Sequence, residues 1–213
     1  MDFLQIFTLI TGVIYIVLEI RQKNFMWVVG IATSLAAMWV FFRQGLYASF
    51  GLNTYYFITA FIGLWQWRRN RSAIAQDSDH EKKSSEDIAP NDQIVLKYLS
   101  LRTIIISAVV AVAGVFLLSH VMIVLHEAGL LGENPMSLLD SVVAVLSAIA
   151  TWWLVKMYRE QWWLWIVADT LSVVLCAMQG MWWMAALYVA YVAAAVYGLH
   201  YWKKCGVHLL DTQ

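Results

Sequence analysis

Two indoles and a carboxylate share one face of a helix that the sequence predicts over residues 161–178. Trp165 stands four residues before Asp169 and Trp162 seven residues before it, a spacing that brings all three onto one helical face. An ionisable side chain inside a membrane segment costs roughly 2.5–3.5 kcal/mol on insertion scales and usually faces a cavity. Two indoles beside one anion can hold a flat, cationic heteroaromatic ring by stacking, cation–π attraction and charge. The alternative is a carboxylate hydrogen-bonded to neighbouring helices, with the tryptophans at the membrane interface.

The composition of the chain predicts that this helix lies in a membrane. Of the 213 residues, 62% are hydrophobic and 13% are charged, and the mean hydropathy is +0.66, whereas a soluble domain is roughly half apolar and a quarter charged. We therefore expect an all-α integral membrane protein with seven transmembrane helices, in contact with the lipid bilayer. The apolar stretches, each near the ~20 residues that span the hydrocarbon core, run over 3–20, 26–42, 50–67, 103–125, 138–157, 161–178 and 181–202.

The positions of lysine and arginine predict the orientation of these helices. Thirteen of the 14 basic residues flank the spans on one side, and Arg43 alone falls on the other. We therefore expect the N-terminus outside and the C-terminus in the cytoplasm. The polar stretch 72–92 is mixed in charge and poor in aromatic residues, which predicts a mobile cytoplasmic linker.

The chain also repeats itself at one constant offset, without a gap, so that helices one to three match helices five to seven. The fourth helix is then a single inserted span that keeps both units in the same orientation. This predicts a 3+1+3 parallel pseudo-repeat of the SWEET-like kind, which transporters use to place a site between two halves. Two Trp- and Gly-rich membrane segments could also align in this way without being repeats. The matched pairs include Trp27 with Trp162, Tyr56 with Tyr191, Gly63 with Gly198 and Trp67 with Trp202.

Polar side chains at repeat positions are further candidates for the site. Asn53 occupies the position of Tyr188, and Tyr56 that of Tyr191, so an amide and phenols could face one central cavity. Thr151 is a weaker candidate, because Asn, Ser and Thr also join membrane helices without any ligand. The predicted substrate-binding set is Asn53, Tyr56, Thr151, Trp162, Trp165, Asp169 and Tyr188.

These observations divide the chain into five segments. The predicted segments are a first three-helix repeat at 1–71, a cytoplasmic polar linker at 72–102, the inserted helix with an outer loop at 103–137, a second three-helix repeat at 138–204 and a cytoplasmic tail at 205–213.

Enzyme, cofactor and metal signatures are missing from the sequence. There is no P-loop motif, and the HExxH zinc motif that His126 and Glu127 could begin fails because residue 130 is Leu. A retinal-binding lysine would have to lie within the last helix, but Lys203 and Lys204 stand only at its end. The basic residues form no continuous face for nucleic acid. We therefore expect a protein that is not an enzyme, with no catalytic residues, no cofactor, no metal site and no nucleic-acid partner.

The sequence resembles the PnuC family of bacterial vitamin transporters, whose branches carry nicotinamide riboside (PnuC) and thiamine (PnuT). The motifs that carry the resemblance are W-x-x-W-x-x-x-D at Trp162, Trp165 and Asp169, GLYASFGLNTYYFITAFIGLWQW over 45–67, and the ending GLHYWKK. The resemblance implies a homotrimer in the bacterial inner membrane. It also implies facilitated diffusion of a small vitamin, which a cytoplasmic kinase traps by phosphorylation.

Three positions bear on which vitamin is carried. Within the resemblance, riboside carriers often have Gln where this chain has Asn53 and Thr151, and Tyr where it has Cys176. The combinations NTYY at 53–56 and ATWW at 150–153, with the acid at Asp169, look more like the thiamine branch. We therefore expect a thiamine transporter, with nicotinamide riboside as the alternative substrate. A sugar carrier or a membrane sensor is a further alternative, although a sugar carrier has no use for a fixed anion.

Overall fold

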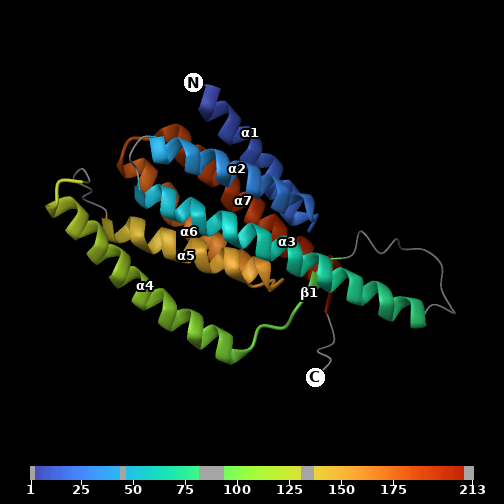
Figure 1. Ribbon diagram of the computed structural model, residues 1–213. Coiled ribbons are helices and arrows are strands. Elements are labelled where there is room, and N and C mark those ends of the chain that lie inside the picture. Colours follow the sequence, from blue (N-terminus) through green and yellow to red (C-terminus); the bar gives the residue numbers. More distant parts are fainter. Residues whose placement is uncertain (1–2, 44–46, 82–93, 131–136, 209–213) are drawn as a thin grey trace. The chain divides into compact units, whose positions relative to one another are not determined.

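The computed structural model describes residues 3–43, 47–81, 94–130 and 137–208 (Figure 1). Within these ranges the chain forms seven helices and two strands of three residues each, so the fold is all-α in its main elements. The elements are α1 (Phe3–Ile20), α2 (Phe25–Arg43), α3 (Tyr47–Glu81), β1 (Ile94–Leu96), α4 (Leu101–Glu127), α5 (Ser137–Val155), α6 (Gln161–Met178), α7 (Trp182–Cys205) and β2 (Gly206–His208).

Helix α3 is much longer than the apolar stretch that predicts it. It has 35 residues and continues to Glu81, whereas the sequence predicts a helix over 50–67. Residues 72–81 of the expected linker are therefore helical, which Figure 1 shows as one continuous ribbon. The rest of that stretch, 82–92, lies outside the described residues. The other six helices begin and end close to the predicted positions.

The chain forms two compact units. The first holds the described residues up to Lys97 together with 154–159 and the segment from His200 onward, and the second holds Tyr98–Trp153 and Glu160–Leu199. In the first unit α2 packs along α3, and α1 packs along α2. In the second unit the Trp153 indole donates a hydrogen bond to Ser107 Oγ over 3.0 Å, which joins α5 to α4.

A tryptophan packed into a glycine notch occurs once in each unit. In the first unit, a Cβ at Gly63 would lie 2.5 Å from the ring of Trp27, so only glycine lets these helices approach as closely as they do. In the second unit, a Cβ at Gly198 would lie 2.6 Å from the ring of Trp162. Both rings are almost completely buried. The two notches stand at positions that the sequence repeat pairs.

The turns before α2 and α6 show the same correspondence. Gln22 has a φ of 50° and Met157 a φ of 62°, and these are the only described residues other than glycine with a positive φ. They too stand at positions that the repeat offset pairs. A non-glycine residue in this region is uncommon, so its recurrence at paired positions indicates that the two turns are built alike.

Two indole hydrogen bonds in the first unit join helices that are far apart in the sequence. Trp67 on α3 donates to the carbonyl of Leu154 at the end of α5 over 3.2 Å. Trp202 on α7 donates to the carbonyl of Ile20 at the end of α1 over 2.9 Å. Each bond joins one sequence repeat to the other, and the two donors are themselves a repeat pair.

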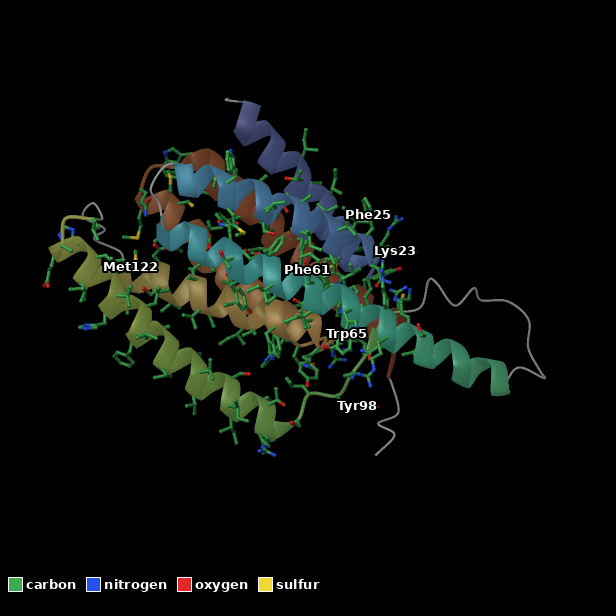
Figure 2. All side chains as sticks on the ribbon, in the orientation of Figure 1. Lys23, Phe25, Phe61, Trp65, Tyr98 and Met122 are labelled. Carbon is green, nitrogen blue, oxygen red and sulfur yellow. The ribbon has the colours of Figure 1, made fainter. Side chains whose placement is uncertain are left out.

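Several helices are long and apolar enough to cross a membrane. Among the described residues these are Leu101–Glu127, Ser137–Val155, Gln161–Met178 and Met184–Cys205, with shorter apolar segments at Ile10–Ile20 and Phe25–Ala36. No residue of α4 is buried, and large apolar side chains such as Phe25, Phe61 and Trp65 are exposed (Figure 2). Such a surface suits a hydrocarbon environment, because in water it would promote aggregation.

Candidate functional site

The buried face of α6 carries the predicted acid. Trp162, Asp169, Ser172 and Cys176 are all buried, and their spacing of seven, three and four residues places them on one side of the helix. Asp169 is 7% exposed. Ser172 and Cys176 are absent from the predicted site, although their positions three and seven residues after Asp169 are a signal that could have placed them on its face.

Two phenols of α7 lie near this carboxylate. Tyr188 and Tyr191 are both within electrostatic range of Asp169, and Tyr188 is also within range of Cys176 and Asp140. The two tyrosine rings pack edge to face, with their centroids 6.0 Å apart and an angle of 86° between their planes. The second unit therefore brings the acid together with two hydroxyl groups and a thiol. The repeat position of Tyr191 is the signal that marked this residue in the sequence.

Among the described residues, no basic side chain neutralises Asp169. Within the part of the chain that the structure describes, no ion pair or hydrogen bond joins the Asp169 carboxylate to another residue. The main feature of its environment is that the carboxylate is buried. A buried carboxylate without a partner is costly, which is why buried charges in proteins are normally paired. The arrangement can therefore receive a cation.

The two predicted indoles differ in their surroundings. Trp165 is half-buried, and its Nε1 is enclosed without a hydrogen-bond acceptor among the described residues. This indole can donate to a bound molecule. Trp162 has no exposed surface, and its ring fills the notch at Gly198, which indicates a packing role. Whether Trp162 also touches a ligand stays a prediction.

The remaining predicted residues have different locations. Thr151 is buried in the second unit, where its hydroxyl donates to the Ser147 carbonyl over 2.9 Å, a local bond that membrane helices often use. Asn53 and Tyr56 lie half-buried on α3 in the first unit. Their part in a shared site also stays a prediction.

Apolar helices of spanning length, with one buried acid that has no ion-pair partner among the described residues, are typical of multi-pass membrane proteins that handle polar or charged solutes. The family model described as nicotinamide mononucleotide transporter matches residues 2–204. The chain therefore belongs to the nicotinamide mononucleotide transporter family. This confirms the resemblance drawn from the motifs, and a transporter family agrees with the expectation that the chain is not an enzyme.

Several characterised proteins are similar to this chain. The nicotinamide riboside transporter PnuC of Escherichia coli strain K12 is 27% identical over 175 residues, which cover 76% of this chain and 69% of that protein. PnuC of Neisseria mucosa is 25% identical over 204 residues, covering 92% and 70%. The crystal structure of the vitamin B3 transporter PnuC is similar in fold, with a TM-score of 0.63, 25% identity and coverage of 93% and 79%.

These relatives bear on the predicted substrate. Both named sequence relatives are nicotinamide riboside transporters, and the similar crystal structure is of a vitamin B3 transporter. The comparisons therefore support the alternative substrate, nicotinamide riboside, better than thiamine.

Proposed function

We propose that this chain carries nicotinamide riboside across a bacterial inner membrane by facilitated diffusion. The observation that carries the proposal is Asp169, a buried carboxylate with no basic partner among the described residues. The ring nitrogen of nicotinamide riboside is bonded to the sugar and bears a permanent positive charge. A bound ring of this kind supplies the cation that Asp169 lacks, and the names of the relatives point to the same molecule.

The other residues around Asp169 suit the rest of the ligand. Trp165 offers a ring for stacking, and a desolvated cation facing an indole is worth roughly 2 kcal/mol. Its buried Nε1 can donate to the carboxamide or to a ribose oxygen. Tyr188 and Tyr191 offer hydroxyl groups that both donate and accept. Asn53, Tyr56 and Thr151 are the further proposed contacts of the ligand, and Trp162 supports this face of α6 from the notch at Gly198.

We also propose that the seven helices cross the membrane as a 3+1+3 parallel repeat. The glycine notches and the positive-φ turns, each recurring at the same offset along the chain, support this architecture. The repeat also supports a single proposed cation site per chain. The positions of Trp165 and Asp169 correspond to Gly30 and Ser34 in the first repeat, which have neither an aromatic ring nor a charge.

Transport is proposed to be passive, with the C-terminus in the cytoplasm, where a kinase phosphorylates the substrate and so retains it. The sequence has no nucleotide-binding P-loop, and among the acids only Asp169 stands in the middle of a predicted span. The homotrimer implied by the family resemblance belongs to this proposal as well.

Thiamine remains the second candidate, because Asn53, Thr151 and Cys176 depart from the residues that riboside carriers often have at those positions. Proteoliposomes with neither ATP nor an ion gradient test both substrates. Labelled nicotinamide riboside should equilibrate across the bilayer, while thiamine and glucose should not. Uptake of thiamine in place of the riboside would overturn the substrate assignment. A requirement for a sodium or proton gradient would overturn the passive mechanism.

A further inference from the structure

The side chain of Gln22 forms hydrogen bonds with the backbone of strand β1. Gln22 Nε2 donates to the Val95 carbonyl over 2.7 Å, and the Val95 amide donates to Gln22 Oε1, also over 2.7 Å. Gln22 has no exposed surface, and Val95 is 3% exposed. One primary amide thus satisfies both backbone groups of a buried strand residue, as a neighbouring strand would.

The same short segment is also held by the second repeat. The Lys97 amide donates to the Met157 carbonyl over 3.1 Å. Strand β1 also pairs in parallel with β2, with Val95 opposite Val207. Segment 94–97 is therefore bound by the turn that follows α1, which Lys23 marks in Figure 2, and by elements that follow α5 and α7. All of these residues belong to the first compact unit.

The two attachments of this segment differ in kind. Towards the second repeat it is held by a strand pairing and a backbone bond to Met157. Towards the first repeat it is held by the Gln22 side chain. Gln22 and Met157 occupy equivalent positions and share the same unusual backbone conformation. Methionine thus fits the turn but lacks the amide, and the joint to Val95 depends on a side chain that only the first repeat provides.

We propose that residues 94–97 form a clasp that holds the ends of α1, α5 and α7 together, and that the joint between Gln22 and Val95 must open for substrate to pass this end. The clasp rests on the proposed transport function, because it assigns a gate to that transporter. A gate at this position controls the rate of passage without contacting the ligand, so Gln22 is a positioning residue. Conformational steps of this type commonly limit turnover.

The substitution Gln22→Met tests the clasp with little change in volume. It places at position 22 the side chain that the equivalent turn already carries, and it removes both hydrogen bonds to Val95. The loss of two such bonds shifts the balance between closed and open clasp by about fivefold to a hundredfold. We expect uptake at saturating substrate to rise about fivefold or more, with the dissociation constant unchanged. An unchanged or slower uptake by folded protein would overturn the proposal.

A second measurement follows the opening directly and does not depend on Gln22→Met folding. Val95→Cys is made in a Cys205→Ser background, which removes the exposed native thiol and keeps the buried Cys176. During turnover a small maleimide should label position 95 faster than without substrate, whereas Val207→Cys, 54% exposed in the parent, should label quickly in both conditions. Equal labelling of position 95 with and without substrate would contradict the clasp.

The purified Val95→Cys protein also shows whether the clasp proposal or the proposed transport function is wrong. Binding of nicotinamide riboside and of thiamine is measured first, and labelling is then followed with whichever molecule binds. A protein that binds thiamine alone refutes the riboside assignment, while its labelling still decides whether the clasp opens during turnover.

Discussion

Truncating Trp162 and Trp165, two of the three tryptophans of α6, should have opposite consequences for folding and binding. Trp162 has no exposed surface and fills the notch at Gly198, so Trp162→Ala leaves a large cavity. Such substitutions cost about 3–5 kcal/mol, and roughly 2–4 °C is lost per kcal/mol in a chain of this length. We therefore expect the melting temperature of Trp162→Ala to fall by roughly 6–20 °C. Trp165 is only half-buried, and Trp165→Ala should melt within a few degrees of the parent.

Binding should rank the two variants in the reverse order. Trp165→Ala loses a cation–π contact worth roughly 2 kcal/mol, which is more than tenfold in affinity because ~1.4 kcal/mol is tenfold. Trp162→Ala, measured well below its melting temperature, should bind within about threefold of the parent. Thermal unfolding in detergent and titration calorimetry with nicotinamide riboside provide the two readouts. The reasoning fails if Trp162→Ala melts like the parent and loses as much affinity as Trp165→Ala.

Two further predictions concern packing and topology. Gly63→Ala and Gly198→Ala should each destabilise the protein by about 1–3 kcal/mol, as overpacked cores do. Gly51→Ala is the control and should not destabilise it, because a Cβ there meets nothing within 4 Å. If all three variants melt at the same temperature, the tight packing of tryptophan against Gly63 and Gly198 is refuted. Cys205 is the exposed one of the two thiols, so a membrane-impermeant maleimide should label it in inverted vesicles and leave it unlabelled in intact cells. Labelling from outside would reverse the proposed topology.

The sequence predicts the helices and the chemistry of α6 well because both depend on local patterns. Apolar stretches of spanning length mark six helix positions closely. The spacing of Trp162, Trp165 and Asp169 places them on one helix without any knowledge of tertiary structure. The constant offset between the repeats pairs both notch tryptophans and both notch glycines before any contact between them is known.

Other features follow from tertiary contacts that leave little trace in the sequence. The polar residues 72–81 extend α3, but hydropathy indicates where a membrane span ends and not where a helix ends. Strands of three residues, such as β1 and β2, are too short to show an alternating pattern. Gln22 and Met157 adopt positive φ without being glycine, so neither carries the usual signal of such a turn. The burial of Trp162, as opposed to the half-burial of Trp165, depends on the notch at Gly198.

The central claim is that Asp169 recognises the positive charge of the ligand, and Asp169→Asn tests it most directly. The variant keeps the size of the side chain and removes its charge. Binding is titrated with nicotinamide riboside and with its reduced form, whose ring has nearly the same shape and no charge. Removing one partner of a buried charge pair costs about 2–5 kcal/mol. We therefore predict that affinity for the cation falls about 30-fold or more, while affinity for the neutral analogue changes less than about threefold. Equal losses for both ligands would contradict the claim and would indicate that the carboxylate organises the helices instead.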